Sequence, residues 1–179
     1  MLIPRENPLR NPLGYKVLRT YQQGEEIYEQ VKKFTANFLH PIADSRLIGH
    51  MNDSARSVPR NIAEGYGRNN TKQYYEFMGF SFGSLLELLE DSLELEKDIN
   101  GGQRKTKDNE AALNKLSAII KLCMGEKTML KSQMDRIDKM AGEQGVLGQN
   151  QRIARVMQEN CRKEKEFDEW LKNIIKKGK

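Results

Sequence analysis

Residues 54–83 read SARSVPRNIAEGYGRNNTKQYYEFMGFSFG, and this stretch decides the fold. Apolar residues recur every three to four positions on both sides of its polar centre, which is the period of one face of an α-helix. Pro59 lies inside the first helical segment, where proline removes one backbone hydrogen bond and clashes with the carbonyl four residues earlier. We therefore predict a helix over residues 47–64 that kinks near 55–59 and ends at Gly65.

The second half of the stretch begins another helix at about Thr71. Asn70 is placed to cap the free backbone donors, and Gln73 is placed to reach back in a capping box. The helix should end at the pair Gly101–Gly102 and be buried on more than one side, because its apolar residues cover more than one face. Its small residues predict a tight helix crossing or a subunit interface; they are Gly79, Ser81, Gly83 and Ser84.

Outward from this stretch, two more helices are predicted. One covers about residues 17–39 and stops at His40–Pro41. The other covers about residues 107–140, with an apolar seam near the 3.5-residue repeat of coiled-coil packing. Its members are Leu113, Leu116, Ile120, Cys123, Leu130, Met134 and Ile137. Four helices with short connections predict an all-α, antiparallel four-helix bundle.

The chain divides into three predicted parts: a proline-rich arm over residues 1–16, the bundle over residues 17–141, and an amphipathic helix over residues 149–178. In the last part Phe167 and Trp170 lie near lysines, but neighbouring acids disfavour an anionic membrane, so we expect it to contact a protein. There is no signal peptide and no apolar run of about 18 residues. We expect a soluble, cytoplasmic protein without a membrane partner.

The net charge of +5 is unevenly distributed. Residues 69–100 are acidic, with only Lys72 and Lys97 opposing seven Asp and Glu residues. The excess of Lys and Arg lies in the N-terminal arm, at residues 56–68, at residues 103–107, and in the tail from Lys172 to Lys179. This pattern is consistent with nucleic-acid contact, and it also describes an ordinary solvated surface.

No constellation for catalysis or cofactor binding is found. Cys123 and Cys161 are too few for a metal cluster or a disulfide framework. Glu87, Glu90 and Glu94 have helical spacing, but a di-metal bundle site needs Glu-x-x-His motifs, which are missing around both histidines. The sequence also lacks a nucleophile with its base, a phosphate-binding glycine loop and an HExxH motif. We predict a protein that is not an enzyme, with no metal and no cofactor.

The run from Arg56 to Gly65 has the pattern R-S-x-P-x-N-I-A-E-G, and it is followed by Arg68 and by the pair Gly83–Ser84. This combination resembles the four-helix-bundle proteins encoded in intervening sequences of bacterial large-subunit ribosomal RNA genes. That family is related to the accessory variability determinants (Avd) of diversity-generating retroelements. The resemblance spans about residues 21–140.

The chain departs from the family pattern at three positions. Asn70 stands for the expected Ser and Gln73 for the expected Glu, and both replacements preserve capping chemistry. Leu89 stands where the pattern G-S-x-x-E-L-E has its second Glu.

The resemblance implies a non-enzymatic adaptor that forms a homo-oligomer, by analogy a pentameric ring. Its implied partners are structured RNA or another nucleic acid, bound through basic surface, and a reverse transcriptase. The setting would be a retroelement ribonucleoprotein or a ribosomal RNA intervening sequence. The alternative is a protein–protein assembly scaffold whose partner docks on the C-terminal helix or the N-terminal arm, without nucleic acid.

The predicted site residues fall into two groups. Those expected to contact nucleic acid are Arg56, Arg60, Arg68, Lys72, Arg104, Lys105, Lys107, Lys172, Lys176 and Lys177. Those expected to be structural are Pro59, Asn61, Glu64, Gly65, Gly83 and Ser84. Structural interpretations stay open for some of them: Arg56 is expected to pair with Glu64 or with an acid of a neighbouring subunit, and Asn61 to cap a carbonyl freed by Pro59.

Overall fold

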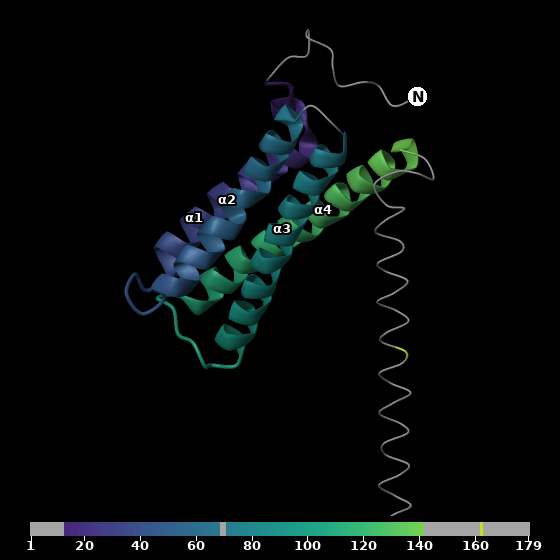
Figure 1. The fold of residues 1–179 in the computed structure, drawn as a ribbon. Coiled ribbons are helices and arrows are strands. Elements are labelled where there is room, and N and C mark those ends of the chain that lie inside the picture. Colours follow the sequence, from purple (N-terminus) through teal and green to yellow (C-terminus); the bar gives the residue numbers. More distant parts are fainter. Residues whose placement is uncertain (1–12, 69–70, 142–161, 163–179) are drawn as a thin grey trace, which may run out of the picture. The chain divides into compact units, whose positions relative to one another are not determined.

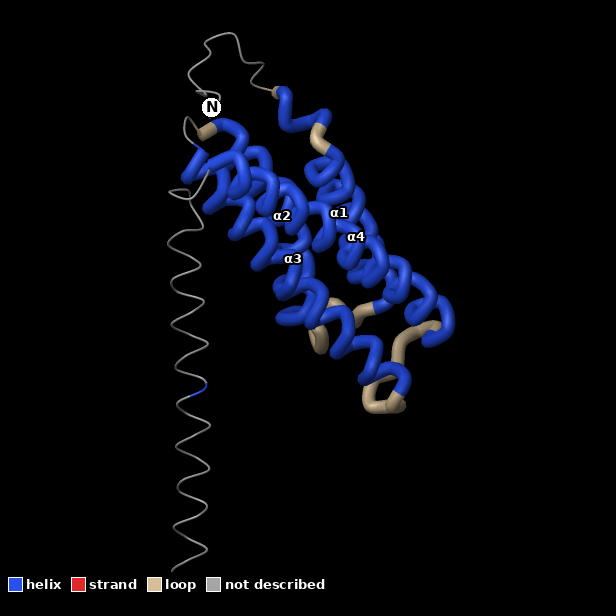
Figure 2. The backbone as a smooth tube through the Cα atoms, turned by 90° about the vertical axis from the view of Figure 1, so that its right-hand side faces the viewer, coloured by secondary structure: helices blue, strands red, loops and turns tan. Residues whose placement is uncertain are grey.

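The computed structural model describes residues 13–68, 71–141 and 162. A short 3-10 helix η1 (Gly14–Val17) precedes four α-helices, which are α1 (Arg19–Phe38), α2 (Ser45–Gly67), α3 (Thr71–Asn100) and α4 (Asn109–Ala141). No strand occurs among these residues (Figures 1 and 2). The predicted all-α four-helix bundle is confirmed. Residues 1–137 form one compact unit and residues 138–179 a second, and the packing below concerns the first.

The helix boundaries agree with the sequence except at the end of α2. α1 ends at Phe38, just before His40–Pro41, and α3 ends at Asn100, just before Gly102, whose φ of 71° only glycine adopts readily. α2 runs through Pro59 to Gly67, so the predicted end at Gly65 is wrong. The expected Asn70 cap, the arm over residues 1–12 and most of the C-terminal segment lie outside the described residues.

All four helices contribute to one apolar core. The seams predicted from helical spacing are buried or packed against the core, including Val31, Met51, Met78 and Leu116. Cys123 is a fully buried thiol, as predicted. The periodicity of the sequence therefore identifies the inner face of each helix correctly.

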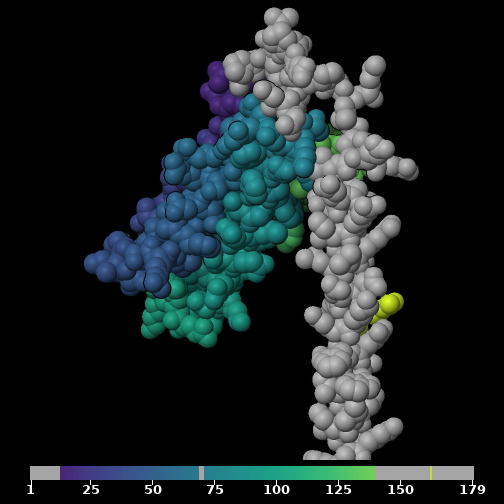
Figure 3. Space-filling model, viewed as in Figure 1, coloured from purple at the N-terminus to yellow at the C-terminus, as the bar shows by residue number. Residues whose placement is uncertain are grey.

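Two glycines allow α2 to approach its neighbours closely. A Cβ at Gly24 of α1 would lie 3.3 Å from the Pro59 ring, and a Cβ at Gly65 would lie 2.7 Å from Phe77 Cβ of α3. Gly65 is thus a close-contact residue inside the helix rather than its cap, which explains why α2 continues past it. Ser81 of α3 adds a hydrogen bond of 2.9 Å from its hydroxyl to the Val58 carbonyl. Figure 3 shows α2 and α3 packed side by side along one face.

Of the small residues predicted to make a tight crossing on α3, Ser81 is buried against α2, whereas Gly79 and Gly83 have no such role in the described chain. A Cβ at Gly79 or Gly83 would meet no atom within 4 Å. The close crossings are instead at Gly24 and Gly65. The other interpretation of Gly83 and Ser84, a contact between subunits, stays a prediction.

The two loops at one end of the bundle are joined by an ion pair. Arg104, in the α3–α4 loop, pairs with Asp44, in the α1–α2 loop, and both side chains are largely buried. Asp44 also accepts a hydrogen bond of 2.8 Å from the His40 backbone N–H. Both loops therefore lie together at the lower end of the bundle in Figure 1.

We expect Gly65→Ala to lower the free energy of unfolding by about 2 kcal/mol, because the new methyl group overpacks the α2–α3 contact. Gly49→Ala is the matched control on the same helix. A Cβ there meets nothing within 4 Å, so it should raise the free energy of unfolding by about 1 kcal/mol. Urea denaturation followed by circular dichroism measures both. Equal effects of the two substitutions would contradict the close packing at Gly65.

Candidate nucleic-acid interface

The exposed face of α2 carries two predicted contact residues on successive turns. Arg56 and Arg60 are exposed, whereas Ala55, Val58 and Ile62 of the same helix are buried in the core. Their separation of four residues corresponds to about 6 Å along the helix axis. Neither guanidinium forms an ion pair within the described part of the chain. They form an outward-facing basic pair, which we call the α2 arginine pair.

Arg68 lies at the end of α2 and is held by two contacts. It forms an ion pair with Glu64, one turn earlier, and its guanidinium lies 4.8 Å from the centre of the Phe77 ring. Glu64 therefore pairs with Arg68 rather than with Arg56, so the predicted Arg56–Glu64 pair is wrong. The reason is geometric, because eight residues of helix separate Arg56 from Glu64 by about 12 Å. Lys72 follows on the first turn of α3 and is exposed.

The remaining described candidates lie at the other end of the bundle. Lys105 and Lys107 are exposed in the α3–α4 loop, but Arg104 is engaged with Asp44. α2, with 23 residues, is about 35 Å long, so this loop lies far from Arg68 and Lys72. The predicted contact residues thus do not meet in one patch. Lys172, Lys176 and Lys177 lie outside the described residues.

The bundle as a whole is almost neutral. Residues 13–141 contain 19 Lys and Arg against 18 Asp and Glu, so the positive excess of the chain lies mainly beyond them. Some acids of α3 face α2: Asp91 lies 2.5 Å from His50 Nδ1, and Glu87 accepts a hydrogen bond from Ser54. The hydrogen bond that His50 donates to Asp91 raises the pKa of His50. Any polyanion contact by the bundle is therefore local rather than spread over its surface.

The residues predicted to be structural lie in two regions, on α2 and on α3. Pro59 and Gly65 are buried where α2 meets α1 and α3, and Asn61 is half-buried between them. No hydrogen bond joins the Asn61 side chain to another group in the described part of the chain. Gly83 and Ser84 are half-exposed on α3.

A buried acid lies in the core at a position that was not predicted from the sequence. Glu126 of α4 is 0% exposed, and neither of its carboxylate oxygens has a hydrogen-bond partner among the described residues. Burial alone raises its pKa to about 8, and burial, with a smaller contribution from Glu126, raises the pKa of Cys123 to about 12. The signal was present, because position 126 continues the apolar seam between Cys123 and Leu130. No group of three metal-ligating side chains surrounds it within the described residues.

A chain of polar groups joins three helices near one end of α4. The Thr20 hydroxyl of α1 donates to Gln133 Oε1 of α4 at 3.1 Å, and Gln133 Nε2 lies 2.5 Å from the Tyr74 hydroxyl of α3. Gln23 of α1 donates to the Leu122 carbonyl at 2.8 Å. These bonds fix how α4 lies on α1, and helical spacing alone does not predict them.

A family model for 23S rRNA-intervening sequence proteins matches residues 16–125. This range contains the whole R-S-x-P-x-N-I-A-E-G run, the α2 arginine pair, and the glycine contacts of α2. The chain belongs to the 23S rRNA-intervening sequence protein family. The resemblance drawn from the motif is thereby confirmed.

The match covers more than half of this intervening-sequence protein and ends one residue before Glu126. A comparison with curated proteins finds no match. No helix in the described part of the chain combines the length and apolar character needed to cross a membrane.

Glu126 should make stability depend on pH. Between pH 4.5 and about 8 the folded state keeps the carboxyl proton and the unfolded state loses it, so stability falls as pH rises through this window. The loss should be on the order of 1 kcal/mol per pH unit. Glu126→Gln should abolish this loss, whereas the exposed control Glu110→Gln should keep it. Urea denaturation at pH 5, 6, 7 and 8 gives the free energy of unfolding of the three proteins. Parallel curves of this free energy against pH for wild type and Glu126→Gln would contradict the assignment.

Proposed function

We propose that this 23S rRNA-intervening sequence protein is a non-enzymatic, cytoplasmic adaptor that binds structured RNA as a homo-oligomer. The α2 arginine pair is the observation that carries the proposal. Guanidinium groups pair with phosphate oxygens in a fixed two-pronged geometry, and such contacts position a protein on nucleic acid without reading sequence. Arg56 and Arg60 point outward and have no ion-pair partner in the part of the chain that the structure describes, which leaves their charge available to a ligand.

Assembly would increase the number of arginines that one polyanion can contact, which is small on a single, almost neutral bundle. A ring would repeat the α2 arginine pair around its circumference, and repeated weak contacts on one polyanion add up through effective concentration. We propose a homopentamer, as the resemblance to Avd proteins suggests. Lys72, Lys105 and Lys107 are exposed and would add further phosphate contacts at the two ends of each bundle.

The partner complex depends on the genetic setting of the chain. Next to a retroelement, we propose a complex of template RNA with a reverse transcriptase. Within a ribosomal RNA gene, we propose the transcript of the intervening sequence. The family description, which refers to 23S rRNA, supports an RNA partner in general terms.

Reversing both charges with Arg56→Glu and Arg60→Glu should weaken binding to a fluorescein-labelled RNA hairpin. The plot of log affinity against log salt should also become shallower by about 1 for each arginine that contacts a phosphate. Fluorescence anisotropy over a salt series measures both effects. The matched control is the double variant Lys121→Glu and Lys127→Glu, which makes the same charge change on the exposed side of α4. The proposal fails if the control loses as much affinity as the arginine variant.

A protein scaffold without nucleic acid is the second candidate, and one observation favours a protein contact on α3. The side chain of Phe80 is 59% exposed. It lies between Gly79 and Gly83, and a Cβ at either glycine would meet no described atom within 4 Å. An exposed aromatic ring beside residues without side chains offers a surface that another subunit can cover.

Phe80→Glu should therefore lower the molar mass measured by multi-angle light scattering while the helical circular dichroism stays unchanged. Met124→Glu is the control, because Met124 is a similarly exposed apolar residue on α4. An unchanged mass for Phe80→Glu would exclude this surface from the assembly. An assembly that forms but binds no RNA at low salt would favour the scaffold.

A further inference from the structure

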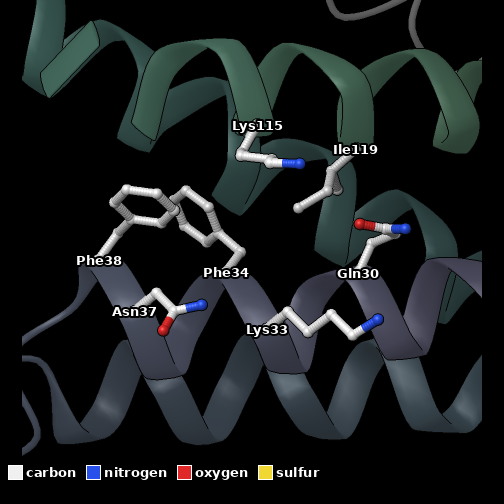
Figure 4. A pocket seen from close by; sticks show the side chains of 7 residues that line it. All are labelled: Gln30, Lys33, Phe34, Asn37, Phe38, Lys115 and Ile119. Atoms are coloured by element: carbon white, nitrogen blue, oxygen red, sulfur yellow. The ribbon is translucent and has the colours of Figure 1, made fainter. Parts of the chain in front are cut away.

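A pocket of about 170 Å³ opens between α1 and α4 (Figure 4). Its apolar wall is formed by Phe34, Phe38 and Ile119. Phe34 is 1% and Ile119 2% exposed, whereas Phe38 is half-buried and borders the opening. The two phenylalanine rings lie together, with centres 5.4 Å apart. The pocket thus has a rigid aromatic wall with one ring accessible from outside.

Polar side chains complete the lining. The amides of Gln30 and Asn37 come from α1, and the ammonium groups of Lys33 and Lys115 come from the two helices. None of these four side chains forms a hydrogen bond or an ion pair in the described part of the chain. Among the described residues, no acidic side chain lines the pocket. A ligand here would meet an apolar ring surface, two amides that both donate and accept, and two positive charges.

The volume is sufficient for a ligand with a single ring. An engineered protein cavity of about 150 Å³ holds one benzene molecule. A six-membered ring therefore fits this pocket.

We propose that this pocket binds an unpaired pyrimidine base of RNA together with its phosphate. The base lies against the accessible Phe38 ring, the amides of Gln30 and Asn37 bond to the base edge, and the lysines neutralise the phosphate. Sequence-specific recognition of RNA uses bases that are unpaired and accessible, stacked on aromatic side chains and read at their edges. The inference rests on the proposed RNA-binding function and adds a site separate from the α2 arginine pair, since the pocket lies between α1 and α4.

Titration of ¹⁵N-labelled protein with uridine 5′-monophosphate, followed by NMR, tests the pocket directly. Saturable shifts are expected in the side-chain amide signals of Gln30 and Asn37. Adenosine 5′-monophosphate should bind about fivefold more weakly, because its two-ring base is larger than the single ring matched to the volume and extends further out of the opening. Asn37→Trp, a substitution at an exposed position that fills the opening, should abolish the shifts. Lys115→Glu should weaken binding, whereas Lys121→Glu, the same change six residues later, should not.

In RNA, a hairpin with a uridine loop should bind about tenfold more tightly than a fully paired duplex of equal length, as expected for one stacked base. Asn37→Trp should remove that preference. Shifts that persist in Asn37→Trp, or equal binding of the two nucleotides, would overturn the proposal. Absence of shifts while structured RNA still binds through Arg56 and Arg60 would overturn the pocket alone. Nucleotide binding without any binding of structured RNA would support the pocket and overturn the proposed function.

Discussion

The close contact of α2 with α1 and α3 is the constraint on which the rest of the bundle depends. Pro59 packs against the bare backbone at Gly24, and Gly65 packs against Phe77 and Tyr74. A larger residue at Gly65 would push α2 outward and open the core beneath Val58 and Ile62. Because its inner face is held so tightly, α2 presents a fixed outer face. The exposed position of Arg56 and Arg60 is thus a consequence of glycine and proline residues on the opposite side of the helix.

The buried carboxyl group of Glu126 on α4 destabilises the core. A carboxyl group without a hydrogen bond is costly in an apolar interior, and a neutral, protonated form reduces the cost without removing it. The polar bonds of Thr20 and Gln23 to α4 lie on either side of the stretch that contains Glu126 and hold this helix against α1. Among the described residues, α4 is the one helix that carries a buried side-chain polar group without a hydrogen bond.

The sequence was sufficient for the fold because helical periodicity and breaker residues are local signals. Pro41 and Gly102 mark helix ends, and the spacing from Val31 to Leu130 identifies the core. Contacts between helices were harder to predict from the sequence. Gly65 was interpreted as a helix end because glycine serves both as a cap and as a point of close approach, and the sequence does not separate these roles. Glu126 was passed over because a charged residue on an apolar seam contradicts the usual pattern of burial.

In the candidate site too, local features can be predicted from the sequence, whereas contacts between distant segments cannot. Exposure of Arg56 and Arg60 follows from their place opposite the apolar face of α2, so spacing predicts it. The pairing of Arg68 with Glu64 follows the local spacing of one helical turn, whereas the pairing of Arg104 with Asp44 depends on which loops the fold brings together. With two of its arginines neutralised in this way, a bundle of almost balanced charge has little long-range attraction for a polyanion. Tight RNA binding by such a bundle requires either repetition of the α2 face in an assembly or short-range contacts of the kind that the aromatic pocket offers.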